Sequence, residues 1–326
     1  MKAVLCKAWG PPESLVVEEL APLTAGTGQV VVSVKAAGVN FPDTLIIQNK
    51  YQHKPPLPFS PGSEVAGVVK QVGDGVAGWE IGDRVIAQTT FGAFAEEVVA
   101  EPSQLIALPE GMDFAPAATL GLAYGTSYYG LIERGRLRAG ETLLVLGASG
   151  GVGLAAIEIG KILGATVIAC ASSEAKLAVC RRHGADETID YTAEDLRARV
   201  KAITQGKGVD VVYDPVGGPY TEPALRDMAW GGRLLVVGFA AGDIPKVPLN
   251  LPLIKGCSIV GVWWGAFAKR DWAQHQANIA QLGRWYAEGR IEPHICATYP
   301  LEQAASALIA LSERRVTGKV VLTTSG

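Results

Sequence analysis

The sequence predicts an α/β fold in which a parallel sheet, covered by helices on both faces, is inserted into a β-rich domain. Strand-like segments and turns alternate over residues 1–122, whereas apolar strands alternate with helical patterns over residues 123–264. The pattern changes again in residues 265–326, a segment too short to form a domain of its own. We therefore expect two domains, with the last segment returning to complete the first.

The first domain is predicted from short runs of β-branched residues. Strands are expected at 30–36, 64–69 and 84–87. Glycine and aspartate at 73–75 and 82–83 indicate turns between them. Several short strands with frequent turns are typical of a barrel-like β domain.

The middle of the chain has the alternation of right-handed βαβ units. Its continuous apolar runs are typical of strands that are buried on both faces of a parallel sheet. Strands are expected at 143–146, 166–171, 187–190, 209–214, 233–239 and 258–262, and helices at 154–163, 174–183, 193–203 and 221–229. In the last segment we expect helices at 272–287 and 302–313 and a strand at 318–323.

Composition and charge exclude several classes of protein. Hydrophobic residues make up 48% of the chain and charged residues 19%, which argues against disorder. The net charge of −3 and the lack of a basic block argue against nucleic-acid binding. We see no membrane span and no signal-peptide pattern, so a cytoplasmic location is expected. The five cysteines are scattered, which predicts neither a disulfide framework nor a structural zinc lobe.

A glycine-rich turn lies between the first strand and the first helix of the middle domain, at Gly147-Ala148-Ser149-Gly150-Gly151-Val152-Gly153. Small residues let the backbone approach a pyrophosphate, and the helix N-terminus offers free N–H groups to it. We expect Gly147, Gly150, Gly151, Val152 and Gly153 to bind a dinucleotide. Ala148 replaces the first glycine of the usual pattern, and a tight turn without a ligand is the alternative interpretation.

The end of the second strand favours NADPH over NADH. An acidic residue at this place usually binds the ribose of NAD, but this chain has Ala171 there. Ser172, Ser173 and Lys176 follow and could bind a 2′-phosphate by hydrogen bonds and charge. Alternatively, Ser173 caps the next helix and Lys176 is merely solvated. Glu174 is an unfavourable neighbour for a phosphate unless its side chain is turned away.

Five motifs together resemble the quinone oxidoreductase branch of the medium-chain dehydrogenase/reductase superfamily, over essentially the whole chain. These are residues 38–43 (GVNFPD), 61–67 (PGSEVAG), the glycine turn, 214–218 (DPVGG) and 318–321 (GKVV). The resemblance implies a Rossmann domain inserted into a GroES-like substrate domain. It also implies a homodimer, in which edge strands of two subunits pair.

The resemblance implies roles for further residues. Asn40 and Thr126 should lie near the nicotinamide, while Gly150, Gly151 and Val152 should meet the pyrophosphate. Ser172, Lys176 and Tyr191 should hold the 2′-phosphate end, and Phe239 and Val262 should line the cofactor groove. Each has a structural alternative: Asn40 as a turn residue, Thr126 as a helix cap, Tyr191 as a half-buried aromatic, and Phe239 and Val262 as core.

Departures from the related zinc alcohol dehydrogenases imply an enzyme without zinc. Asn40 and Ser63 stand where those enzymes have Cys and His ligands, and Leu122 corresponds roughly to the third ligand, a Cys. Asparagine, serine and leucine cannot form a tetrahedral zinc site. Without a Lewis acid, the acceptor should already be electron-poor, such as a quinone or an α,β-unsaturated carbonyl.

The candidate catalytic residues are Tyr51, Asn40 and Thr126. By resemblance to enoyl-thioester reductases, the Tyr51 hydroxyl could donate to a developing enolate, although Tyr51 could equally be a pocket wall. The leading interpretation is an NADPH:quinone oxidoreductase with a small-molecule acceptor. An enoyl-thioester or enone reductase and an NADPH-binding structural or RNA-binding protein remain as alternatives. Trp263 and Trp264 follow the last expected strand, and if the extended backbone continues through them they should face opposite ways.

Overall fold

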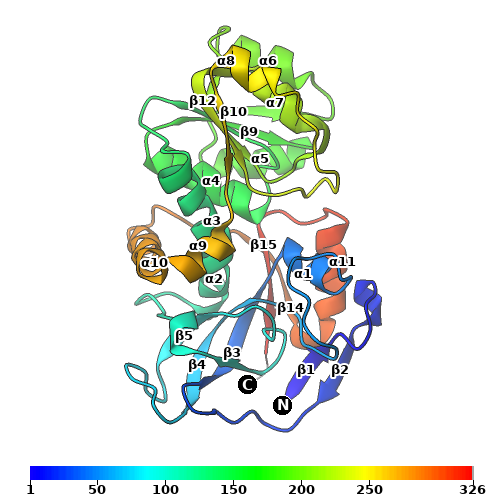
Figure 1. Cartoon of the computed structure of the whole chain (residues 1–326), viewed down its shortest axis with the longest axis vertical. Coiled ribbons are helices and arrows are strands. Elements are labelled where there is room, and N and C mark those ends of the chain that lie inside the picture. The colour runs from blue at the N-terminus through cyan, green and yellow to red at the C-terminus, as the bar shows by residue number, and fades with distance from the viewer. Residues whose placement is uncertain (325–326) are drawn as a thin grey trace. The chain divides into compact units, whose positions relative to one another are not determined.

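The computed structural model describes residues 1–324. Contacts divide the chain into two compact units (Figure 1). Unit 1 comprises Met1–Leu122 and Pro293–Gly326, and unit 2 comprises Ala123–Glu292. The first boundary coincides with the expected one, so the units correspond to the β-rich domain and to its insert.

Unit 1 is built on a seven-stranded, mostly antiparallel sheet. The strand order is β14-β15-β3-β4-β5-β7, and β6 pairs with β3. The strands are β3 (Val30–Val39), β4 (Glu64–Val72), β5 (Arg84–Gln88), β6 (Glu97–Ala100), β7 (Leu105–Ala107), β14 (Ile295–Pro300) and β15 (Lys319–Thr323). A separate pair contains β1 (Lys2–Leu5) and β2 (Val16–Glu19), and the helices are α1 (Phe41–Ile46), α2 (Phe114–Thr119) and α11 (Ala304–Ser312).

The long strand β3 organises unit 1. Its first residues are β-branched and fully buried, which suits a strand that pairs with three neighbours. Its partner strand β4 carries Gly67, where a Cβ would lie 2.1 Å from the carbonyl oxygen of Ser33. Glycine is therefore required for this close approach. On its other side β3 pairs with β15, so Val39 lies opposite Val320, near the other end of the chain.

Unit 2 contains a six-stranded parallel sheet in the order β10-β9-β8-β11-β12-β13. This is the Rossmann order, with its reversal between β8 and β11. The strands are β8 (Thr142–Val145), β9 (Thr166–Ala171), β10 (Glu187–Asp190), β11 (Val209–Asp214), β12 (Met228–Val236) and β13 (Ser258–Gly261). The helices are α3 (Gly125–Tyr128), α4 (Gly151–Ile162), α5 (Glu174–Arg182), α6 (Leu196–Ile203), α7 (Thr221–Arg226), α8 (Asn250–Lys255), α9 (Trp264–Arg270) and α10 (Trp272–Ala287). The predicted doubly wound α/β class is confirmed.

Several element boundaries differ from the prediction for local reasons. Helix α6 begins at Leu196 because Asp195 caps it by accepting a hydrogen bond from the Ala198 N–H, at 2.7 Å. Strand β12 begins at Met228, where the sequence predicted a helix, and it ends before Phe239. Strand β13 ends at Gly261, and Trp264 opens a helix. The two tryptophans thus follow the strand as expected, but the expectation that they continue its extended backbone is wrong.

The last segment divides differently from the prediction. Residues 265–292 cluster with unit 2, and only the chain from Pro293 onward belongs to unit 1. Helix α10 packs on α3 and α9, and the Asn278 amide donates to Glu133 at 2.5 Å. These contacts bind α10 to the Rossmann unit. Within residues 1–324 no helix is both long and apolar enough to cross a membrane.

Candidate functional site

The glycine turn of unit 2 leaves an open helix N-terminus. Helix α4 begins at Gly151, and its N-cap, Gly150, provides no side-chain hydrogen bond to the first N–H groups. A Cβ on Gly153 would lie 2.6 Å from the carbonyl oxygens of Gly147 and Ala148, so only glycine lets the helix close on the turn. Gly147 itself has a φ of +58°, which glycine favours. The turn is shaped to receive an anion at the first turn of α4.

A hydroxyl and an ammonium group lie together at the end of β9. The Lys176 ammonium donates to the Ser172 hydroxyl at 3.1 Å. Within residues 1–324 the Lys176 side chain forms no ion pair, whereas Glu174 is held by Arg181 at 2.5 Å. The carboxylate of Glu174 is thus engaged by Arg181 rather than by Lys176. Ser173 does cap helix α5, by accepting from the Lys176 N–H at 3.4 Å.

Tyr191 lies beside the position where an NAD-binding acid would be expected. Its N–H donates to the carbonyl of Ala171 at 3.2 Å, directly after β10. Its ring packs on that of Tyr220, with ring centroids 4.2 Å apart. The Tyr191 backbone is therefore bonded to the residue that precedes Ser172, while its half-buried ring packs on Tyr220.

The remaining predicted residues of unit 2 lie in or beyond its elements. Phe239 follows β12 in a loop and is half-buried, and its ring lies against Gly217. Val262 follows β13, is buried, and donates its N–H to Val236. Thr126 is buried inside α3, which begins at Gly125, so it does not cap a helix that starts at Ser127.

Asp214 holds the loop that follows β11, a role that its place in the 214–218 motif did not reveal. Its buried carboxylate accepts from the N–H groups of Val216 and Gly217, at 2.9 and 2.8 Å, and from the Thr221 hydroxyl at 2.6 Å. These bonds hold the loop after β11, next to the point where the strand order reverses. An aspartate at a strand end followed by Pro-Val-Gly-Gly was the available signal.

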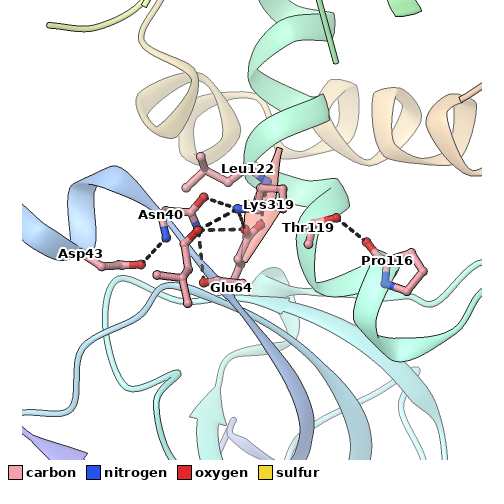
Figure 2. Close-up of polar contacts among 9 residues, drawn as sticks. Asn40, Asp43, Glu64, Pro116, Thr119, Leu122 and Lys319 are labelled. Carbon is pink, nitrogen blue, oxygen red and sulfur yellow. Dashed lines mark hydrogen bonds and ion pairs between the residues drawn. The ribbon is translucent and has the colours of Figure 1, made fainter. Parts of the chain in front are cut away.

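Unit 1 contains a buried polar network around Asn40 (Figure 2). The Lys319 ammonium donates to the Asn40 amide oxygen and, at 3.0 Å, to Glu64. The Asn40 amide nitrogen donates to the same carboxylate oxygen of Glu64 at 2.8 Å. The other carboxylate oxygen accepts from the Leu122 N–H at 2.8 Å. Asn40 is therefore not merely a turn residue.

Asp43 and Tyr51 extend the polar part of unit 1. The buried Asp43 carboxyl accepts from the Asn40 N–H at 2.8 Å. Burial raises the pKa of Asp43 to about 7, against the opposing effects of this hydrogen bond and of the Lys319 charge. Burial and, second, the charge of Asp43 raise the pKa of Tyr51 as well. Tyr51 is half-buried, packs on the core of unit 1, and keeps its proton at neutral pH.

The network does not fit a zinc ion. At the positions where zinc alcohol dehydrogenases have ligands, Asn40 and the Leu122 backbone are bonded to the Lys319–Glu64 pair. The Lys319 ammonium would repel a second cation, and neither an amide nor a leucine replaces a thiolate. No cluster of three or more His, Cys, Asp or Glu side chains able to hold a metal occurs in residues 1–324.

The predicted site residues thus fall into two groups. The glycine turn, Ser172, Ser173, Lys176, Tyr191, Phe239, Val262 and Thr126 belong to unit 2, whereas Asn40 and Tyr51 belong to unit 1. Ser172 and Lys176 are in direct contact after β9, and the Tyr191 backbone is bonded to the neighbouring Ala171. The structure adds four polar residues to which the sequence assigned no role. These are Asp43, Glu64 and Lys319 in unit 1 and Asp214 in unit 2.

Two family models match the sequence. Residues 26–110 match a model described as the alcohol dehydrogenase GroES-like domain, and residues 151–281 match one described as zinc-binding dehydrogenase. The matched ranges lie in unit 1 and unit 2 respectively. The description of the second model refers to zinc, but the residues around Asn40 do not suit a zinc ion. A match to this family model therefore does not by itself imply that the chain binds a metal.

Relatives match over nearly the whole chain. The chain is 39% identical over 327 residues to quinone oxidoreductase-like protein 2 homolog of Nematostella vectensis, covering 99% of this chain and 89% of that protein. It is 35% identical to human quinone oxidoreductase, over 94% of this chain and 92% of that protein. The structure of Escherichia coli quinone oxidoreductase complexed with NADPH has a TM-score of 0.92 at 31% identity, covering 99% of this chain and 100% of that one. The chain therefore belongs to the quinone oxidoreductase branch of the medium-chain dehydrogenase/reductase superfamily.

Proposed function

We propose that this protein is an NADPH-dependent oxidoreductase that transfers hydride to quinones or related electron-poor carbonyl compounds, without zinc. Two neighbouring features carry the proposal. Helix α4 has an uncapped N-terminus, and the carboxyl end of β9 is followed by Ser172 and Lys176 instead of the acidic residue that binds the ribose of NAD. The relatives named as quinone oxidoreductases, one of them crystallised with NADPH, support the same activity.

In this proposal, unit 2 holds the nucleotide. Gly150, Gly151 and Val152 present backbone N–H groups to the pyrophosphate, and Gly147 and Gly153 let the backbone come close. The Ser172 hydroxyl and the Lys176 ammonium bind the 2′-phosphate, with the Tyr191 ring beside them. Phe239, Val262 and Thr126 border the nicotinamide half. The bound nicotinamide supplies the hydride, and the chain's own residues orient it and exclude water.

Asn40 and Tyr51 are the candidates of unit 1 for the reacting end. Since Asn40, Ser63 and Leu122 provide no Lewis acid, the acceptor must be activated by its own electron-poor structure. A quinone meets this requirement because it accepts hydride without prior polarisation of its carbonyl. Tyr51, with its raised pKa, can donate a hydrogen bond to an oxygen that gains negative charge.

Tyr51 also favours a second candidate function, the reduction of enones or enoyl thioesters. An enolate needs a proton or a strong hydrogen bond during the reaction, whereas a quinone acceptor depends on it less. We expect Tyr51→Phe to slow enone reduction by roughly 10-fold or more and to leave quinone reduction within roughly 2-fold, a general acid being worth at most a few orders of magnitude. Equal rates for both proteins on both acceptors would remove Tyr51 from the mechanism.

The exposed edge of unit 2 supports a homodimer. Strand β13 ends the sheet, and Ile259 on it is 42% exposed. Nearby in the chain, Leu253 and Ile254 of α8 are 80% and 66% exposed. An open strand edge flanked by apolar side chains fits pairing with the same edge of a second copy. Sedimentation velocity should give a dimer that Ile259→Lys converts to a monomer; a monomeric wild type would refute this part.

The experiment that tests the function is a panel of acceptors. NADPH oxidation is followed by absorbance with an ortho-quinone, a para-quinone, a simple enone and crotonyl-CoA, and each assay is repeated with NADH. We expect turnover of quinones with a clear preference for NADPH. Turnover of crotonyl-CoA alone would assign the second function, and NADPH binding without turnover of any acceptor would contradict both.

A further inference from the structure

The Lys319 ammonium lies inside unit 1 with every donor engaged. Lys319 is 5% exposed and opens β15, which runs antiparallel to β3 and brings the lysine next to Asn40. Its Nζ donates to the Asn40 amide oxygen, to Glu64 at 3.0 Å and to the Val39 carbonyl at 3.2 Å. An ammonium group has three N–H donors, so none remains for a bound molecule. Lys319 therefore acts only through its neighbours.

The pairing of β3 with β4 leaves room for the Glu64 carboxylate, the partner of Lys319. Glu64 is 1% exposed and pairs with Gly38 across β3 and β4. A Cβ on Gly38 would lie 2.4 Å from the Glu64 Oε1 atom and 2.2 Å from the Ala118 carbonyl oxygen. Glycine at this position thus admits the carboxylate. Both Glu64 oxygens are hydrogen-bonded, which makes the buried ion pair tolerable.

The ion pair determines which way the Asn40 amide faces. A lysine only donates, so the amide oxygen must face Lys319, and an ionised carboxylate only accepts, so the amide nitrogen must face Glu64. The second N–H of the amide is directed to the Gly38 carbonyl at 3.3 Å. Both amide donors are used inside unit 1. Toward a bound molecule the side chain can therefore only accept, through an oxygen that also faces the Asp43 N–H in the capping box of α1.

We propose that Lys319 and Glu64 are positioning residues that lock Asn40 as a hydrogen-bond acceptor. A molecule bound at Asn40 must then offer an N–H or O–H group, as the carboxamide or ribose hydroxyls of a nicotinamide nucleotide do. The role in the reaction rests on the proposed function, whereas the lock on the amide does not.

The lock can be tested without any assay of activity. The sequence has only four asparagines (Asn40, Asn49, Asn250 and Asn278), so selective ¹⁵N labelling gives a simple side-chain amide spectrum. Asn40→Ala assigns the Asn40 signal. We expect its protons to exchange slowly in the wild type and at least roughly 10-fold faster in Lys319→Met, because without the ammonium on its oxygen the amide can turn away from Glu64 and Gly38. Asn278, bonded to Glu133 and Gln274 in unit 2, is the internal control.

A second variant keeps the test decisive if Lys319→Met folds poorly. Lys319→Met leaves Glu64 charged and unpaired, whereas Lys319→Met with Glu64→Gln removes both charges. The double variant should still release the Asn40 amide, since Oδ1 loses its ammonium donor. Unchanged exchange of Asn40 in the double variant, with Asn278 also unchanged, would overturn the lock.

The consequence for the reaction is measured by a double-mutant cycle. Hydride transfer from NADPH is followed in single turnovers for Asn40→Ala, for Lys319→Met and for the two combined. We expect each single change to slow transfer by roughly 10-fold or more through misplacement. The combined variant should be no slower than the slower single variant, with NADPH affinity changed by less than roughly 3-fold because the phosphates are held elsewhere. Lys319→Arg should restore part of the rate that Lys319→Met loses.

Additive losses in the double-mutant cycle would overturn the positioning role. A wild type that never oxidises NADPH would refute the proposed function instead, and the exchange experiment would still decide the lock.

Discussion

Two buried carboxylates, one in each unit, hold the chain beside the points where it passes between the units. Glu64 of unit 1 accepts from the N–H of Leu122, the last residue before the chain enters unit 2. Glu158 of unit 2 accepts from the Tyr124 hydroxyl at 2.7 Å and from the N–H of Glu292, the last residue before the chain leaves. Both are at most 7% exposed. Each carboxylate thus anchors the backbone next to a passage between the units, but the remaining hydrogen-bond partners differ.

The partners differ in charge. Glu64 forms an ion pair with Lys319, whereas Glu158 is bonded to the neutral hydroxyl of Tyr124 and, at 2.6 Å, to the His183 imidazole. Burial and the charge of Glu158 raise the pKa of Tyr124, so its hydroxyl remains a donor. Removing one partner of a buried ion pair leaves an uncompensated charge, while removing a neutral donor does not. Unit 1 should therefore be the more sensitive of the two to single substitutions.

The largest expected effect separates the ion pair. Lys319→Met should lower the free energy of unfolding by roughly 3 to 5 kcal/mol, because Glu64 is left buried without a counter-charge. The measurement is urea denaturation. Adding Glu64→Gln should recover a large part of the loss, since the lone charge is then gone. If the double variant were as unstable as the single one, charge would not be what distinguishes this site.

The next effect is the pH dependence that Asp43 adds to unit 1. Its pKa is near the ordinary 3.8 in the unfolded chain and about 7 in the folded protein, mainly because of burial. The folded state thus holds a proton that the unfolded state has released, and stability falls as pH rises from about 4 through 7. Relative to Asp43→Asn, the wild type should lose roughly 3 to 4 kcal/mol over this range, each pKa unit being worth about 1.4 kcal/mol. Parallel stability profiles for the two proteins would contradict the buried-proton explanation.

The smallest expected effect concerns the hydrogen-bond network around Glu158 in unit 2. Glu158→Gln keeps one acceptor oxygen but turns an amide group toward donors, which should lower the free energy of unfolding by roughly 1 to 3 kcal/mol. Tyr124→Phe removes a single hydroxyl and should have a smaller effect, about 0.5 to 1.5 kcal/mol. Both are measured in the same denaturation experiment as Lys319→Met. A loss for Glu158→Gln as large as that for Lys319→Met would remove the contrast between the two carboxylates.

The predictability of the fold followed the strength of the hydrophobic signal. Strands β8, β9 and β11 were predicted almost to the residue, because strands buried on both faces leave continuous apolar runs. The exposed strand β2 and the edge strand β14 leave no such runs and were not predicted, and the short buried strand β1 was missed as well. Helix α10 was predicted, but not the unit to which it belongs, since one amphipathic pattern suits packing on either unit.

The candidate site divides in a similar way. The glycine turn could be predicted because its function lies in the backbone, and Ser172 and Lys176 because they follow a strand end whose position the turn specifies. The Lys319–Glu64 pair could not, because the two residues are 255 positions apart and only the pairing of β15 with β3 brings them together. Lys319 stood in a recognised motif, yet nothing in the sequence identified its partner.

The most direct test of the central claim, that unit 2 binds NADPH through Ser172 and Lys176, is calorimetric titration of the wild type with NADPH and with NADH. We expect NADPH to bind at least roughly 10-fold more tightly, since charge-assisted hydrogen bonds to a phosphate are worth about 1.5 to 3 kcal/mol. Lys176→Ala should abolish most of that difference, while Lys201→Ala, an exposed lysine of α6, should leave it intact. Equal affinities for the two nucleotides in the wild type, or a preference that survives in Lys176→Ala, would contradict the assignment.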